Sequence, residues 1–345
     1  MKSVVGINPD NVTSWMVEHV DAVAPLSFDL VAGGRSNLTF RVSDAIGSAY
    51  ALRRPPTSHV LATAHDMVRE HTIISALYPL GIPVPRPLGL CTDVEVNDQP
   101  FYVMEFVEGA VVRNETESAA AFDLATRGRI GANLATTLAH LHEVNVDQAG
   151  LGDLARHDGY IERQLKRWRS QYDQMQVEGV EHGGLIEEVG DQLAASIPTQ
   201  QRVSVVHGDY RLDNTVLDDE GHVKAILDWE ICTLGDPMAD LGVLLDYWAE
   251  PQDEMAALLG SAPTTAPGFA TRHQVLEAYA SQSNLDVSNI AYYCSFGYWK
   301  LACIMQGVFA RYSAGATAGD LGSVTEYPAH ITLLARMAQQ TLEQR

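Results

Sequence analysis

The sequence predicts an α+β protein with two lobes: a five-stranded antiparallel sheet carrying one helix, then a mainly helical part. Segments with period-two alternation lie before residue 109, whereas helical periodicity dominates after residue 118. The 345 residues also exceed the usual size of a single hydrophobic core. We therefore predict an N-terminal lobe over residues 1–108 and a helical C-terminal lobe over residues 109–345.

The N-terminal lobe begins with a predicted helix over residues 9–23, because Pro9 and Asp10 are typical of a first helical turn. Alternation then predicts three consecutive strands, in LSFDLVAGG, NLTFRVSD and AYALRRP, joined by glycine-containing turns. Residues 60–78 are predicted to be helical, and two further strands are expected in VPRPLGLC and PFYVMEFVEG. Consecutive strands with short connections imply antiparallel pairing.

In the C-terminal lobe, apolar spacing predicts helices over 122–142, 160–175, 185–196, 237–249, 269–282, 287–312 and 328–344. Two short strands interrupt them, VSVVHGD and VKAILDWE, and both end in acidic residues. The Pro-, Gly- and Ala-rich stretch 251–268 is predicted to be a surface loop.

Charge and composition narrow the function classes. The chain has 46% hydrophobic residues, and 44 acidic against 23 basic residues give a formal net charge of −21. A molecule of this charge repels nucleic-acid backbones and anionic lipid surfaces, so we expect neither nucleic acid nor a membrane as a partner. The four cysteines form no CxxC pair, and there is no apolar span of 18 residues. We therefore expect reduced thiols and a cytoplasmic location.

The motif that indicates chemistry is VHGDYRLDN at residues 206–214, followed by AILDWE at residues 225–230. It supplies Asp209, Asn214 five residues later and Asp228 fourteen residues after that. Phosphoryl transfer needs a carboxylate that orients the attacking hydroxyl and oxygen ligands for the metal that bridges the phosphates. We predict Asp209 as the catalytic carboxylate and Asn214 with Asp228 as ligands of Mg²⁺.

These segments resemble the HxDxxxxN loop and the metal-binding Asp of small-molecule kinases of the aminoglycoside phosphotransferase and choline kinase type. The resemblance covers residues 25 to 310 and implies a bilobal, protein-kinase-like fold that holds ATP and Mg²⁺ between its lobes. It also implies transfer of the γ-phosphoryl group to a hydroxyl of a small molecule. The stretches LRRPP, GGRSNLTFRV and LDWEICTLGDPMADLG further resemble a group that includes kinase domains fused to acyl-CoA dehydrogenases, which points to hydroxyacyl thioesters as acceptors.

The resemblance assigns nucleotide-binding residues to the N-terminal lobe. Arg53 stands where the family has a phosphate-gripping lysine, and Glu70 stands where its partner belongs. If Arg53 lay instead on the solvent face of its strand, Ala51 would face outward too. The short loop residues Ser36 and Asn37 are expected to cover phosphates through their N–H groups. The backbone near Glu105 and Val107 is expected to meet adenine.

Other residues carry weaker expectations. The aromatic residues Tyr247, Trp248 and Trp299 are candidate walls of the substrate site. We expect His207 to be structural and His142 to pack at its helix end. Two acidic residues one turn apart, Asp236 and Asp240, are expected to brace the catalytic loop.

A different class of function stays open at this point, a nucleotide-binding pseudokinase that senses or scaffolds. The complete set of Asp209, Asn214 and Asp228 argues against it, whereas Arg53 in place of lysine argues for it. The acidic composition permits an aminoglycoside acceptor without requiring one.

Overall fold

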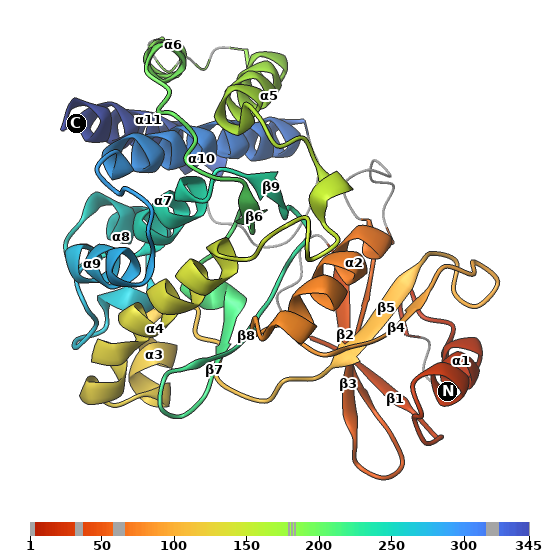
Figure 1. Cartoon of the computed structure of the whole chain (residues 1–345). Helices are drawn as coiled ribbons and strands as arrows, with labels where there is room; N and C mark the ends of the chain where they lie inside the picture. The colour runs from red at the N-terminus through yellow and green to blue at the C-terminus, as the bar shows by residue number, and fades with distance from the viewer. Residues whose placement is uncertain are drawn as a thin grey trace. The chain divides into compact units, whose positions relative to one another are not determined.

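The computed structural model describes residues 4–31, 37–57, 66–178, 180, 182, 184–314 and 324–344. The chain divides into two compact units (Figure 1). Unit 1 comprises Met1–Val111, Ala149–Leu151 and Asn214–Cys232, and unit 2 comprises Val112–Gln148, Gly152–Asp213 and Thr233–Arg345. Residues 214–232 thus join unit 1 by their contacts. The two lobes drawn from the sequence, with their boundary between residues 108 and 109, stay a prediction.

Unit 1 is built on a five-stranded sheet in which all paired strands are antiparallel, as the sequence predicts. The strands are β1 (Ser27–Leu30), β2 (Leu38–Ser43), β3 (Ala49–Arg54), β4 (Pro87–Cys91) and β5 (Phe101–Glu105), in the order β1-β2-β3-β5-β4. Helix α1 (Pro9–His19) adds buried Val12 and Met16 to a core with Phe40 and Leu52. Helix α2 (Met67–Leu77) packs against β4 and β5 and is capped by the Asp66 side chain.

A hairpin of β7 (Thr215–Leu217) and β8 (Val223–Ile226) also belongs to unit 1. It is joined to the segment after β5 by two backbone hydrogen bonds between Ala110 and Leu217, of 2.8 and 2.9 Å. A Cβ at Gly109 would lie 2.4 Å from the Leu217 carbonyl oxygen, so this approach requires glycine. The sequence predicted β8 but not β7.

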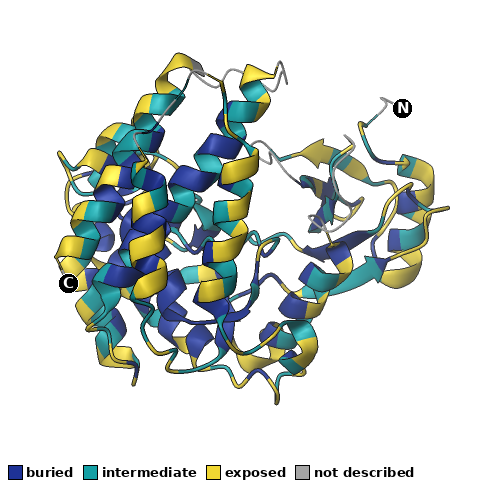
Figure 2. Ribbon diagram, turned by 90° about the horizontal axis from the view of Figure 1, so that it is seen from above, coloured by how far each residue is buried: buried dark blue, intermediate teal, exposed yellow. Residues whose placement is uncertain are grey.

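Unit 2 is mainly helical, as expected. Its helices are α3 (Glu115–Ala121), α4 (Leu124–His142), α5 (Tyr160–Gln174), α6 (Leu185–Ala195), α7 (Met238–Tyr247), α8 (Glu254–Leu259), α9 (Arg272–Gln282), α10 (Ile290–Ser313) and α11 (Tyr327–Glu343). Helix α10 packs against α5, α6, α7 and α11. Helix α7 is buried along nearly its whole length, whereas other helices expose one side and bury the other (Figure 2). Among the described residues, no helix combines the length and apolar character that a bilayer crossing requires.

The structure corrects the sequence prediction at several places. Residues 251–268 are not a plain surface loop, because they contain α8 and bury Met255, Ala262 and Ala266. Helix α3 and strand β9 (Thr233–Gly235), which pairs with β6 (Ser204–Val206), were not predicted. The N-terminal helix ends at His19 rather than at residue 23.

Candidate active site

Arg53 is the centre of a charged cluster in unit 1. Its Nε donates to Glu70 Oε2 at 2.9 Å, and its Nη2 donates to Asp228 Oδ1 at 2.5 Å. Its Nη2 also lies 3.6 Å from a carboxylate oxygen of Glu230. The Arg53 side chain is 12% exposed, and Ala51 is buried as well, so Arg53 does not lie on a solvent face. A guanidinium from β3 therefore links the carboxylate of α2 to the one that follows β8.

Glu70 is buried in the first turn of α2 and accepts three kinds of donor. The Tyr102 hydroxyl donates to Oε2 at 2.9 Å, the Asn37 side-chain amide donates to Oε1 at 2.9 Å, and Arg53 completes the set. Burial raises the pKa of Glu70, and the charge of Arg53 opposes that rise. Although burial alone would lower the pKa of Arg53, the surrounding acidic groups, Glu70 first, raise it above its ordinary value. The guanidinium is thus permanently charged and fixed in direction.

Of the two loop residues predicted to cover phosphates, Ser36 lies outside the described residues. Asn37 is buried, and its side-chain nitrogen bonds Glu70 and, at 3.2 Å, Glu230. Asn37 is therefore part of the same cluster through its side chain, a contact that the sequence did not predict.

The predicted metal ligands lie at one end of the β7–β8 hairpin. Because Thr215 pairs with Ile226, Asn214 comes opposite residue 227, and the Leu227 N–H donates to the Asn214 carbonyl at 2.8 Å. Asp228 follows directly with a left-handed φ of 63°, which is uncommon outside glycine and concentrates at functional sites. The Asp228 side chain is 34% exposed.

The donor set at this hairpin end fits Mg²⁺. Amide and carboxylate oxygens are hard ligands, and Mg²⁺ usually takes only one or two protein ligands beside waters and substrate phosphates. The described part of the chain contains no group of three or more His, Cys, Asp or Glu side chains in a metal-binding arrangement. Asn214 and Asp228 could supply one or two oxygen ligands of this kind.

At the predicted hinge, Glu105 and Val107 differ in whether their backbone groups are already hydrogen-bonded. The Glu105 N–H donates to the Arg86 carbonyl at 2.9 Å and is used within unit 1. The backbone of Val107 makes no hydrogen bond with the described residues, so its N–H and C=O suit the edge of a base.

Asp209 lies in unit 2, on a turn that α7 holds. The Asp240 carboxylate accepts the N–H of His207 at 2.5 Å and the N–H of Gly208 at 2.7 Å. Although burial alone would raise the pKa of Asp240, bonds and charges from His142, His207 and Gly208 lower it below the ordinary value. The Asp209 N–H in turn donates to His207 Nδ1 at 3.3 Å. His207 and Asp240 thus brace the loop, as predicted.

Arg211 is a site residue that sequence reasoning missed. Its Nε lies 3.2 Å from Asp209 Oδ1, its Nη1 lies 3.1 Å from Asp213 Oδ2, and its guanidinium lies 4.6 Å from the centre of the Tyr247 ring. The acids and Tyr247 outweigh burial and raise the pKa of Arg211. Its position within the HxDxxxxN motif is the only sequence signal that marked it.

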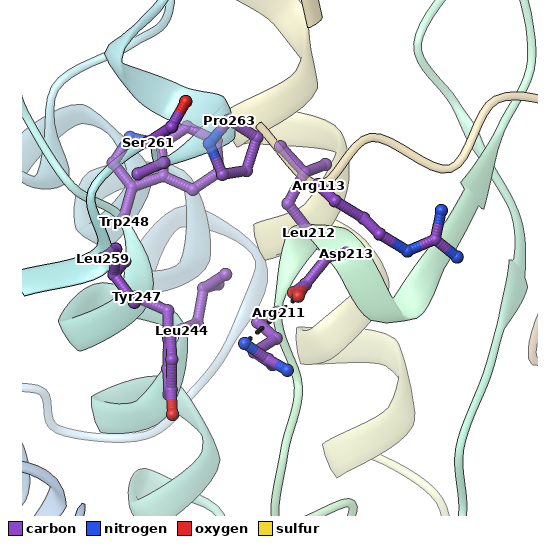
Figure 3. Close-up of a pocket in the computed structure, with 11 residues that line it drawn as sticks. Arg113, Arg211, Leu212, Asp213, Leu244, Tyr247, Trp248, Leu259, Ser261 and Pro263 are labelled. Atoms are coloured by element: carbon purple, nitrogen blue, oxygen red, sulfur yellow. Dashed lines mark ion pairs between the residues drawn. The ribbon is translucent and has the colours of Figure 1, made fainter. Parts of the chain in front are cut away.

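A pocket of about 110 Å³ opens beside Arg211, within unit 2 (Figure 3). Figure 3 shows the Arg211 guanidinium beside the Asp213 carboxylate, with their ion pair dashed. The other lining residues are Arg113, Leu212, Leu244, Tyr247, Trp248, Leu259, Ser261, Ala262 and Pro263. Four of these residues, at positions 259 and 261–263, lie in the stretch for which a surface loop was predicted. The pocket is mostly apolar, with two guanidinium groups.

The three aromatic candidates do not meet in one place. Tyr247 and Trp248 line this pocket, and Trp248 Nε1 donates to the Ala270 carbonyl at 2.8 Å. Trp299 lines a separate hollow between α5 and α6, and its Nε1 donates to the Ile186 carbonyl at 2.8 Å. Trp299 is fully buried, so its main contacts are those of a core residue.

The remaining predicted structural residues take internal partners. The His142 ring bonds the Tyr279 hydroxyl at 2.7 Å and lies 3.6 Å from Asp240. Asp236 accepts the Tyr293 hydroxyl at 2.7 Å and the Met238 N–H at 3.1 Å. Asp236 therefore ties the start of α7 to α10 rather than bracing the catalytic loop as predicted, and Asp240 is the acid that holds that loop.

Comparison with known proteins agrees with this arrangement. Residues 27–272 match the model of the phosphotransferase enzyme family. The acyl-CoA dehydrogenase family member 11 of Gallus gallus is 32% identical over 307 residues, which are 86% of this chain but only 38% of that protein. The chain therefore spans well under half the length of this relative.

Two solved structures are similar in fold. A protein of Ralstonia eutropha JMP134, provisionally assigned as an aminoglycoside phosphotransferase, is 28% identical with a TM-score of 0.81, covering 97% of this chain and 98% of its own. The amicoumacin kinase hAmiN, in complex with AMP-PNP, Ca²⁺ and Ami, is 17% identical with a TM-score of 0.61, covering 98% and 94%. At that identity the second likeness concerns the fold alone. The chain has a kinase-like fold and belongs to the phosphotransferase enzyme family.

Proposed function

We propose that the protein transfers the γ-phosphoryl group of ATP, with Mg²⁺, to a hydroxyl of a small molecule. The observation that carries this proposal is the Arg53–Glu70–Asp228 cluster of unit 1, in which a buried guanidinium links two carboxylates. A cation on β3, an acid on α2 and an acid after β8 are the three charged positions that phosphoryl transfer uses in kinase-like proteins.

The residues of unit 1 take the phosphate-binding roles in this proposal. Bound MgATP supplies the phosphoryl group and the cation that neutralises its oxygens. Arg53 is held in direction by Glu70, and its planar fork suits two phosphate oxygens. Asn214 and Asp228 would hold Mg²⁺, and the Val107 backbone would bind the base.

The residues of unit 2 take the acceptor roles. Asp209 orients the acceptor hydroxyl and accepts its proton. A carboxylate can do this when it lies within hydrogen-bond distance of the hydroxyl. Arg211 pairs with the Asp209 carboxylate, and its guanidinium packs on the Tyr247 ring. Since the transition state is loose, positioning and charge neutralisation supply most of the rate.

The pocket beside Arg211 favours a metabolite over an aminoglycoside as the acceptor. An aminoglycoside is a polycation and calls for several carboxylates. Among the described residues that line this pocket, Asp213 is the only acid, and Arg211 already pairs with it. The resemblance to kinase domains fused to acyl-CoA dehydrogenases also favours hydroxyacyl thioesters over antibiotics.

The experiment that tests the proposal combines binding and turnover. ATP with Mg²⁺ should raise the melting temperature by mass action, and ATP without metal should raise it less. ATP consumption should then depend on the acceptor across a panel of hydroxyacyl thioesters, other hydroxylated metabolites and aminoglycosides. No stabilisation at millimolar nucleotide would contradict the kinase function. Stabilisation without turnover on any acceptor would favour the pseudokinase alternative.

A further inference from the structure

Lys300, on α10, reaches the turn that carries Asp209. Its Nζ donates to the Gly208 carbonyl at 3.2 Å and lies 5.8 Å from the centre of the Trp168 ring on α5. Lys300 is largely covered, unlike most lysines, and belongs to unit 2 together with both of these neighbours. Neither the motif nor the comparisons assign it a role.

The Gly208 carbonyl belongs to the peptide that joins Gly208 to Asp209. The N–H of the same peptide, that of Asp209, donates to His207 Nδ1 at 3.3 Å. Lys300 and His207 therefore hold the two polar ends of one peptide plane. The preceding N–H groups, of His207 and Gly208, are held by Asp240. Gly208 itself has a left-handed φ of 87°, which glycine adopts about as readily as a negative φ, so its own backbone preference does not select this conformation over others.

Titratable groups surround Lys300 from three elements. They are Asp209 on the loop, Asp240 and Asp246 on α7, and Arg167 on α5. Burial, the largest influence, and Arg167 lower the pKa of Lys300. Asp209 and Asp240 oppose that shift, and Asp246 opposes it only where it is ionised, so the pKa is lowered overall. Covering an ammonium costs free energy that a neutral donor to the same carbonyl would not cost.

We propose that Lys300 is a positioning residue for phosphoryl transfer, which holds the Gly208–Asp209 peptide so that the Asp209 carboxylate points at the acceptor hydroxyl. This inference rests on the proposed function of Asp209. Lys300 acts through the loop and not on the nucleotide. Its removal should therefore lower kcat and leave the KM for ATP nearly unchanged.

The test compares Lys300→Met, which keeps the stem without the ammonium, with Lys300→Arg, which keeps the charge. Lys166→Met is the matched control, because Lys166 is an exposed lysine on α5 in the same unit. At neutral pH, Lys300→Met should lower kcat by about 10- to 100-fold, the equivalent of losing one hydrogen bond to a charged group. Lys300→Arg should keep most of the activity, and Lys166→Met should keep all of it.

The pH profile separates positioning from mere structural support. In the wild type, kcat should fall on the alkaline side as Lys300 loses its proton, earlier than for an exposed lysine because its pKa is lowered. Lys300→Arg should shift that fall to higher pH, since an arginine stays protonated there. An identical alkaline limb in both proteins would overturn the inference.

Amide hydrogen exchange gives a readout that needs no acceptor. Lys300→Met should speed exchange in residues 207–209 and leave α11 unchanged, whereas Lys300→Arg should not. Unchanged exchange in the loop of Lys300→Met would overturn the inference. If the wild type transfers no phosphoryl group at all, the proposed function fails, and loop exchange alone decides whether Lys300 orders this turn. If Lys300→Met does not fold, the Lys300→Arg profile still decides.

Discussion

Arg53 is held by Glu70 and Asp228 at once, so its replacement tests both binding and folding. Arg53→Ala should weaken ATP binding or turnover by about 1.5–3 kcal/mol, the worth of a hydrogen bond to a charged group. Arg53→Lys should recover only part of this, because an ammonium is a point charge and lacks the planar fork. Steady-state kinetics at varied ATP, with nucleotide affinity measured separately, give both quantities.

Arg41→Ala is the control for Arg53. Arg41 lies on the neighbouring strand β2 and pairs with Glu108, but its side chain is 45% exposed. Exposed pairs contribute little, so ATP kinetics should stay as in the wild type. Arg53→Ala should also lower the free energy of unfolding, because it leaves the buried Glu70 without its cation. Equal kinetics in wild type, Arg53→Ala and Arg53→Lys would remove Arg53 from the site.

At the scale of elements, the close crossing of α7 and α10 depends on glycine. A Cβ at Gly242 on α7 would lie 2.8 Å from the backbone carbonyl carbon and oxygen of Tyr293 on α10. Backbone atoms cannot rotate away, so Gly242→Ala should force the helices apart and destabilise the protein by about 1–3 kcal/mol. Urea unfolding measures this change.

Gly128→Ala on α4 is the matched control for the crossing. There the nearest atom to an added Cβ is the Gly268 carbonyl oxygen at 3.4 Å, an ordinary contact. Helix propensity then favours alanine by about 1 kcal/mol, so this variant should be as stable as the wild type or more stable. A stable Gly242→Ala protein would show that the crossing tolerates a wider separation.

Elements that could be predicted from the sequence are those with enough residues to show a period. The helices α4, α5 and α11 were placed within two residues of their observed ends and α10 within three, because each carries a long apolar face. The strands β7 and β9 have three residues each, too few for alternation to be seen. Strand β6 is as short, but it lies in the segment VSVVHGD, which was predicted as a strand. Helix α8 has six residues inside a Pro- and Gly-rich stretch, and tertiary packing of Met255 holds it.

The residues of the candidate site also fall into those that could be predicted from the sequence and those that could not. Arg53 and Glu70 were predicted as partners from the resemblance to the kinase family, which has such a pair on successive elements, and the structure pairs them at 2.9 Å. The contacts of Arg211 with Asp209 and Tyr247 depend on how the loop and α7 meet, which no local pattern reports. Trp299 was predicted as a substrate wall because the resemblance places late helices beside the acceptor site, and only the fold shows that it lines another hollow.

At the scale of the whole molecule, the stability should depend on pH through Asp246. This carboxyl on α7 is buried, and neither oxygen has a hydrogen-bond partner among the described residues. Burial raises its pKa well above the ordinary value, against the influence of Cys294, Arg272 and other neighbours. Between the unfolded and folded pKa values, the folded protein holds a proton that the unfolded chain has lost. The contribution of Asp246 to stability therefore falls as pH rises through this window.

Asp246→Asn tests this dependence, because the amide stays neutral at every pH. The stability of the variant relative to the wild type should rise with pH from 5 to 8, by at most about 1.4 kcal/mol per pH unit. Asp286→Asn is the control, since bonds from Ser288 lower the pKa of Asp286. The pKa of Asp286 then lies below pH 5 in both the folded and the unfolded protein. The stability difference between Asp286→Asn and the wild type should therefore not change from pH 5 to 8. Urea unfolding at several pH values provides the comparison, and a flat difference for Asp246→Asn would contradict a buried, protonated Asp246.

The most direct measurement of the proposed function follows the phosphoryl group itself. Wild-type protein and Asp209→Asn are incubated with MgATP and the panel of hydroxylated acceptors, and phosphorus NMR identifies the products. The wild type should form a phosphate monoester of one acceptor class together with ADP. Asp209→Asn should bind ATP with similar affinity and form that product about 10²- to 10⁴-fold more slowly, the usual worth of a positioned general base. Equal rates of product formation in the two proteins, or ADP with inorganic phosphate as the sole products for every acceptor, would contradict the account.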